Sequence, residues 1–310
     1  MNHQTHSFTY TNNPSISFCK HCSTISVKNK TTYKPHTFRS HTEINPITHL
    51  QTLIQRSHTL KPSKNSLYIK IRLTGINVVK ALATKYALNE SIYHSSIHLL
   101  DYLYLQKAYT ENIQLTAIAC TVLMTKFLAE GRVAMLIQNE LIATGYIKTD
   151  VYVVHEVNIL KCVDYDLSFV TAFDILNALL HVGITFNDEE QPTKSLEKMY
   201  FGCLLQLNSF VEKKVFVNYT PIEIAFAIVA FTRELYEFNN EMNLVLLCDM
   251  FNISAGSYCE CYMLFKSKIR VQKCRSNNSN NSNSSSSNSN SSEITEHQQL
   301  QQQQNTISVI

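Results

Sequence analysis

A helical repeat of apolar positions stands out between residues 115 and 126. The apolar side chains recur at intervals of three and four residues, which places them on one face of a helix. The stripe consists of Leu115, Ile118, Ala119, Val122 and Leu123, with Lys126 following on the same face. We therefore predict a helix over residues 110–128 that packs at the centre of a helical domain and ends in a charge.

A second apolar pattern covers residues 149–163. Thr149 is a candidate N-cap, and Asp150 places an acid in the first turn. The stripe predicted for this helix comprises Val153, Val157, Leu160 and Val163, with Glu156 on or beside it. Two helices thus each carry one charge, Lys126 and Glu156, next to their core-facing stripe. Such charges can form a surface ion pair of small energetic value, or they can offer their polar heads to a partner.

The remaining periodic segments predict an all-α protein with two tandem domains of five helices each. In the first domain we expect helices over residues 67–85, 90–106, 110–128, 134–143 and 149–163, after a leading helix over 47–58. In the second we expect helices from Thr171 through Leu180 and over residues 195–210, 221–236, 240–251 and 254–268. Short connections of this kind are typical of helix bundles.

Capping signals mark two helix starts in the second domain. Thr220 is a cap residue, Pro221 takes the first helical position and Glu223 the third. The helix that follows is almost wholly apolar, so we expect it to be the central helix of its domain. Thr171 and Asp174 have the spacing of a second capping box.

Composition agrees with helical domains between polar tails. The 310 residues are 45% hydrophobic and 16% charged, and they include only six Gly and six Pro, which argues against a β-sandwich. Residues 1–45 form a polar arm without periodicity, and residues 271–310 are rich in Asn, Ser and Gln. We expect both tails to be disordered. The two helical domains are then predicted over residues 46–168 and 169–270.

Charge is distributed unevenly along the chain. Residues 1–70 hold nine of the 27 basic residues and one of the 24 acids (Glu43), a net charge of about +8. The rest holds 18 basic and 23 acidic residues, a net charge of −5. A basic arm can attract nucleic acid or acidic partners, although it is more often a solvated segment.

Candidate catalytic and metal sites are few. Cys19 and Cys22 form a CxxC, but a zinc site needs four ligands and no second pair follows at a usual spacing. No Gly-rich phosphate loop, HExxH or GxSxG motif occurs. Most of the nine cysteines lie in apolar runs, which indicates a reducing compartment, and no apolar run reaches the roughly 18 residues of a membrane span. We expect no enzyme activity, cofactor, metal or membrane contact, and a location in the nucleus, the cytoplasm or both.

Four positions resemble the core of a cyclin box. Lys126 and Glu156 have the spacing and helical context of the lysine and glutamate with which cyclins hydrogen-bond a cyclin-dependent kinase near its mobile helix. Arg72 and Asp101 stand where cyclins place a buried arginine–aspartate bridge between the first two box helices. The resemblance covers about residues 47–270 and implies that the two helical domains are tandem five-helix cyclin boxes.

The resemblance also implies a function. It is that of a noncatalytic subunit that binds and activates a cyclin-dependent Ser/Thr protein kinase in cell-cycle control. The kinase-facing residues carried over from the family are Leu123, Lys126, Phe127, Glu156, Leu160, Tyr165 and Leu167. The alternative is a cyclin-box factor that binds nucleic acid or a transcriptional kinase, because related boxes bind DNA. The net charge of −5 outside the first 70 residues disfavours a nucleic-acid partner.

The chain departs from the cyclin pattern in two places. Residues 128–129 are Leu and Ala where cyclins usually have acids, so we expect some kinase contacts to be absent. Gly75, Val78 and Ala81 replace the large apolar and acidic residues of the substrate-docking patch found in cyclins of the A, B and E types, although Gln114 is kept. We therefore do not expect docking of arginine–x–leucine substrates.

Overall fold

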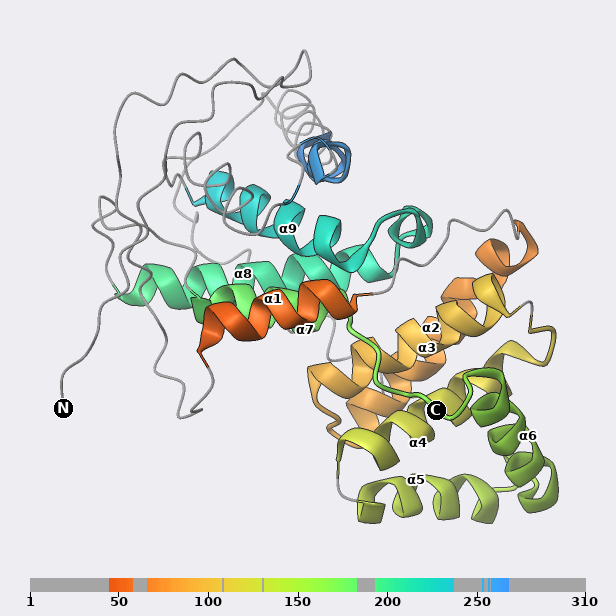
Figure 1. The fold of residues 1–310 in the computed structure, drawn as a ribbon. Coiled ribbons are helices and arrows are strands. Elements are labelled where there is room, and N and C mark those ends of the chain that lie inside the picture. Colours follow the sequence, from red (N-terminus) through yellow and green to blue (C-terminus); the bar gives the residue numbers. More distant parts are fainter. Residues whose placement is uncertain are drawn as a thin grey trace, which may run out of the picture. The chain divides into compact units, whose positions relative to one another are not determined.

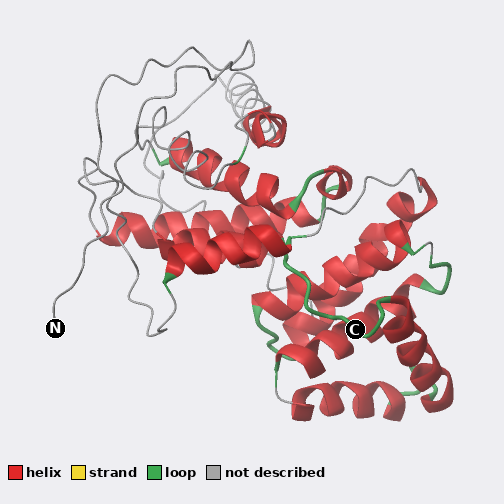
Figure 2. Cartoon of the chain, in the orientation of Figure 1, coloured by secondary structure: helices red, strands yellow, loops and turns green. Residues whose placement is uncertain are grey.

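The protein is described by a computed structural model over residues 45–57, 66–107, 109–129, 131–182, 193–236, 253, 256 and 258–267. Within these ranges the ordered elements are all helices, without a strand (Figure 2), which confirms the predicted all-α fold class. The tails predicted to be disordered, apart from Asn45, and the helix predicted over residues 240–251 lie outside the described residues.

The described residues up to Cys162 form six helices (Figure 1). They are α1 (Pro46–Arg56), α2 (Ser66–Lys85), α3 (Glu90–Gln106), α4 (Ile113–Leu128), α5 (Gly131–Ala143) and α6 (Thr149–Cys162). Each overlaps a predicted helix. Asparagine side chains cap three of them, with Asn45, Asn89 and Asn112 accepting backbone N–H groups of the first turns of α1, α3 and α4.

The start of α6 differs from the prediction. Thr149 is already helical, and Lys148 is the N-cap residue, without a side-chain cap bond. The carbonyl of Lys148 accepts the N–H of Tyr152 at 2.9 Å, so the N-cap lies one residue before the expected one. The prediction of Thr149 as N-cap was therefore wrong. Asp150 still lies in the first turn, where the helix dipole favours an acid.

The second half contains α7 (Ala172–Val182), α8 (Thr193–Val211), the 3₁₀ helix η1 (Lys214–Asn218) and α9 (Pro221–Leu235), and residues 258–267 are also helical. Both predicted capping boxes are confirmed. The Thr220 hydroxyl accepts the N–H of Glu223 at 3.2 Å, and the Glu223 carboxylate accepts the N–H of Thr220 at 2.7 Å. At α7, the carboxylate of Asp174 accepts the N–H and hydroxyl of Thr171, both at 2.8 Å.

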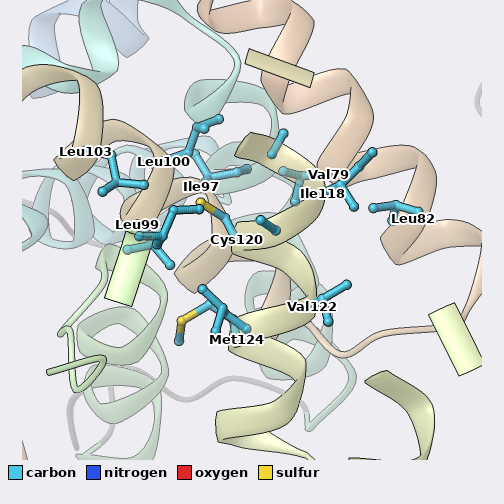
Figure 3. Packing of buried hydrophobic residues seen from close by; sticks show 14 of the residues in the cluster. Val79, Leu82, Ile97, Leu99, Leu100, Leu103, Ile118, Cys120, Val122 and Met124 are labelled. Atoms are coloured by element: carbon cyan, nitrogen blue, oxygen red, sulfur yellow. The ribbon is translucent and has the colours of Figure 1, made fainter. Parts of the chain in front are cut away.

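Helix α4 lies at the centre of the first helix group, α2–α6. It packs against α2, α3, α5 and α6, and its side chains from Thr116 to Thr125 are buried. Figure 3 shows the apolar side chains of α4 meeting those of α2 and α3. Gly75 allows this close approach, because a Cβ there would lie 2.7 Å from Leu100 Cδ2 and 3.1 Å from Ile113 Cγ1.

The second helix group consists of α1 and α7–α9. Helix α9 is buried from Ile224 to Arg233, as expected of a central helix, and α7 and α8 pack on it. Helix α1, assigned to the first domain by its place in the sequence, packs against α7, and its Leu50 is fully buried. Contacts between α3 and α7 join the two groups, and the predicted domain boundaries stay a prediction.

Candidate partner-binding surface

Lys126 and Glu156 lie together at one edge of the first helix group. Lys126 is in the last turn of α4 and Glu156 in the middle of α6, and Lys126 Nζ donates to Glu156 Oε1 at 2.5 Å. The side chain of Lys126 is 37% exposed and that of Glu156 is 12% exposed. The packing of α6 on α4 therefore brings together two charged side chains that are distant in sequence, at a position that solvent can reach.

A buried polar network holds α6 against the start of α4. His155 Nε2 lies 3.2 Å from Thr116 Oγ1, and His155 Nδ1 lies 3.3 Å from the Tyr109 hydroxyl. Thr116 donates its hydrogen to the carbonyl of Asn112 at 2.8 Å, so Nε2–H of His155 donates to Thr116 and Nδ1 accepts from Tyr109. Burial lowers the pKa of His155 and favours this neutral ring. Since Glu156 is the next residue, the network fixes its direction.

Helix α6 turns a different face to the core than predicted. Its buried residues are Tyr152, His155 and Ile159. Val153 and Val157, predicted to be core-facing, are 45% and 38% exposed, so this part of the prediction was wrong. All four valines of α6 are exposed, Val151 and Val154 as well as these two. The larger Tyr152 and the hydrogen-bonded His155 fill the side toward α4. Val153 and Val157 extend the surface beside Glu156, and the sequence analysis missed them as site residues.

The predicted apolar surface around the charge pair is only partly exposed. Phe127 and Tyr165 are 51% and 64% exposed, and Leu160 is half-buried. Leu123 and Leu167 belong to the hydrophobic core at 4% and 8% exposure, which corrects their expected place at the surface. Leu123 is buried because it lies in the middle of the central helix. The structure thus brings Lys126, Phe127, Glu156, Leu160 and Tyr165 to the surface and keeps the two leucines inside.

The turn after α6 presents Tyr165. Asp164 and Tyr165 have left-handed backbone conformations, with φ of 52° and 59°, which are uncommon for residues other than glycine. The N–H of Tyr165 donates to the carbonyl of Leu160 at 2.8 Å, and the N–H of Asp166 donates to that of Val163 at 3.0 Å. Backbone conformations of this kind cluster at functional sites, and here they direct an aromatic side chain outward.

Arg72 and Asp101 lie together in the core between α2 and α3. Arg72 Nε donates to Asp101 Oδ1 at 2.7 Å, and Nη2 donates to Oδ2 at 2.8 Å, with both side chains at most 2% exposed. The Tyr68 hydroxyl also donates to Asp101 Oδ1, at 2.5 Å. Burial opposes the charge of Arg72, but the adjacent carboxylate more than offsets it, so the pKa of Arg72 is raised. This bidentate pair is the geometry that a buried arginine requires.

The chain is similar to a solved structure of known class, the X-ray structure of a viral cyclin from Herpesvirus saimiri. The TM-score is 0.53 at 18% sequence identity, and the match covers 71% of this chain and 96% of that chain. The chain has a cyclin-like fold. No protein-family model and no curated protein matches the sequence.

The cyclin-like core places a hydrogen-bond donor and an acceptor beside exposed apolar side chains. This combination suits recognition of another protein, because apolar contacts exclude water around a small number of polar bonds. Among the described residues there is no cluster of side chains that could hold a metal ion, and no helix long and apolar enough to cross a membrane. Cys19 and Cys22 lie outside the described residues.

Proposed function

We propose that this chain is a cyclin-like regulatory subunit that binds and activates a cyclin-dependent Ser/Thr protein kinase in cell-cycle control. The observation that carries the proposal is the contact between Lys126 and Glu156, 30 positions apart in sequence and 2.5 Å apart in space. It occurs in a cyclin-like fold, in which Phe127, the residue after Lys126, and Tyr165, in the turn after α6, are exposed. Five of the seven residues that resemble the kinase contacts of cyclins are accessible to a partner, and Leu123 and Leu167 are buried beneath the surface.

The chemistry of the pair suits the backbone of a partner helix. An ammonium group has three N–H donors and a carboxylate has two acceptor oxygens, so Lys126 and Glu156 can bond each other and a partner at the same time. Val153 and Val157 on the same helix as Glu156, and Phe127 next to Lys126, add exposed apolar side chains. On binding, these contacts would favour the kinase conformation with its mobile helix swung in, and this differential affinity would shift the kinase toward its active state.

The proposed role is regulatory. The chain contributes no catalytic group and needs no cofactor, and the kinase performs the phosphoryl transfer in the nucleus, the cytoplasm or both. Substrate docking through the first box helix is not part of the proposal. Gly75 on that helix is buried against Leu100 and Ile113, so position 75 offers no side chain to a substrate.

The test is to measure binding and activation of a candidate cyclin-dependent kinase by Lys126→Ala and Glu156→Ala. Losing one partner of a desolvated charged hydrogen bond costs about 2–5 kcal/mol of binding free energy. Each variant should therefore raise the dissociation constant of the complex about 30-fold or more. Because both side chains reach solvent in the free protein, the melting temperature should fall by no more than about 2–4 °C.

A charge swap separates recognition from a merely intramolecular role. In the double variant Lys126→Glu/Glu156→Lys the two charges can still pair with each other, but donor and acceptor are exchanged toward the partner. Recognition predicts that the swap stays defective, whereas an ion pair that only supports the fold predicts rescue. Lys161→Ala, an exposed charge on the same helix, is the matched control and should activate normally. Full activation by the Lys126→Ala/Glu156→Ala double variant would contradict the proposal.

A further inference from the structure

We propose that Arg72 is a clasp between the two helix groups. In this proposal its buried guanidinium holds the end of α8 against α2 and α3, so that the second helix group stays docked on the first. Arg72 then has two roles, the ion pair with Asp101 inside the first helix group and the hydrogen bonds to the end of α8 in the second. The proposal does not depend on kinase binding.

The guanidinium reaches the backbone of the second helix group directly. Arg72 Nη1 donates to the carbonyl of Val211 at 2.7 Å and to that of Lys213 at 3.3 Å. Val211 is the last residue of α8, and the last carbonyls of a helix have no donor within the helix. A cation at this end also complements the helix dipole. The ring of Phe216 in η1 lies with its centroid 5.4 Å from Arg72 Cζ, which adds a cation–π contact from the same segment.

The forked shape of the side chain lets one charge serve both groups. Nε and Nη2 are directed at Asp101 on α3, while Nη1 is directed at the α8 end. Undocking α8 would exchange two charge-assisted hydrogen bonds for bonds to water, and it would uncover an ion pair that is now almost fully buried. A lysine has a single charged nitrogen and cannot reproduce this fork.

Other polar contacts cross the same boundary and converge on the same stretch of chain. Lys80 Nζ pairs with Glu212 Oε1 at 2.7 Å, but the two side chains are 58% and 29% exposed. His94 Nε2 lies 2.9 Å from Asn208 Oδ1. Exposed ion pairs contribute little to stability, so the buried Arg72 cluster should decide docking and the Lys80–Glu212 pair should not. The exposed pair is therefore a matched control across the same boundary.

The experiment is hydrogen exchange and trypsin cleavage on the full chain, comparing wild type, Arg72→Lys and Lys80→Met. Amide hydrogen bonds from Lys213 to Phe210 and from Phe216 to Lys213 make this turn a direct reporter. In Arg72→Lys, exchange over residues 211–219 should be at least about tenfold faster than in wild type, as expected when a charge-assisted bond is lost from the closed state. Exchange in α4 should be unchanged, and cleavage after Lys213 and Lys214 should accelerate. Lys80→Met should match wild type in both measurements.

Other distributions of the change would overturn the proposal. Faster exchange confined to α2 and α3 would make Arg72 a bridge within the first group alone, and a uniform increase throughout would make it a general stabiliser. If Arg72→Lys does not fold, Phe216→Leu decides the question, because it removes the ring over the guanidinium and leaves the Asp101 pair intact. Selective opening of residues 211–219 in that variant supports the clasp, and unchanged exchange there refutes it.

Discussion

Asp101 accepts hydrogen bonds from three donor atoms in the core, namely the Tyr68 hydroxyl and two nitrogens of Arg72. Asp101→Ala would remove all of these acceptors and leave Arg72 with an uncompensated charge, which costs about 3–5 kcal/mol of unfolding free energy. Urea unfolding at pH 7 measures this loss. Lys85→Met, which removes an exposed partner of Glu140, is the control and should change little. Equal urea midpoints for the two variants would contradict a buried, uncompensated arginine.

His94 makes stability depend on pH. Its ring is 4% exposed and stacks on Phe173 with centroids 5.4 Å apart, and Glu90 Oε2 and Asn208 Oδ1 face its Nε2. Burial lowers the pKa of His94 to about 4, although the bond to Asn208 opposes this. The unfolded chain therefore binds a proton at a higher pH than the folded chain does. The contribution is fully present above about pH 6.5 and is lost as the pH falls toward 4, by roughly 3 kcal/mol in all.

The variant His94→Gln tests this pH dependence, because glutamine keeps an N–H for Asn208 but does not titrate. Urea midpoints at pH 7 and pH 4.5 should differ less in His94→Gln than in wild type. If the urea midpoints of wild type and His94→Gln fall by the same amount between pH 7 and pH 4.5, His94 does not cause the loss of stability in acid.

Helix α9 begins with a full capping box and a proline at its first helical position. The capping box of Thr220 and Glu223 precedes ten residues that are all buried, from Ile224 to Arg233. Thr220→Ala should lower the free energy of unfolding by about 1 kcal/mol, since it removes the acceptor for the N–H of Glu223. Thr220→Ser keeps the hydroxyl and should retain most of the stability in thermal unfolding. A loss as large for serine as for alanine would mean that the methyl packing of Thr220 matters more than its cap.

Helices α4 and α6 show how far an apolar pattern determines an element. Helix α4 is buried around its circumference, so any apolar face read from its sequence lies in the core. In α6 all four valines are exposed, so a core-facing stripe drawn through them gives the wrong rotation of the helix. The rotation is set by Tyr152 and His155, because a large ring and a hydrogen-bonded imidazole fill the space against α4 better than valines do. The exposed valines beside Glu156 are a consequence of that choice.

The excess of basic residues and the candidate partner-binding surface lie in different parts of the chain. The basic excess lies in residues 1–70, whereas the remainder carries a net charge of −5. The candidate surface lies in that remainder and consists of one basic and one acidic side chain among apolar ones. Nucleic-acid binding needs basic side chains spread over a surface, so this arrangement favours a protein partner. The fold similarity to a viral cyclin extends over 71% of the chain.

The sequence by itself determined where most helices lie and which two are central. Caps such as Thr220 and Thr171 accept a backbone N–H only three residues away, and a buried central helix has a long apolar run, so a local stretch of sequence shows both. Lys126, Glu156, Arg72 and Asp101 resemble positions of the cyclin box, and the cyclin-like fold agrees with that resemblance.

Only the tertiary structure decided the face of α6, the partner of α1 and the burial of Leu167. It also showed that Arg72 bonds to Val211, 139 positions away, in addition to Asp101. The face of α6 and the partner of α1 depend on which side chains pack best into the same space. The second role of Arg72 depends on which backbone carbonyls lie next to its guanidinium. Such choices are made between segments that are distant along the chain, and no local pattern of residues records them.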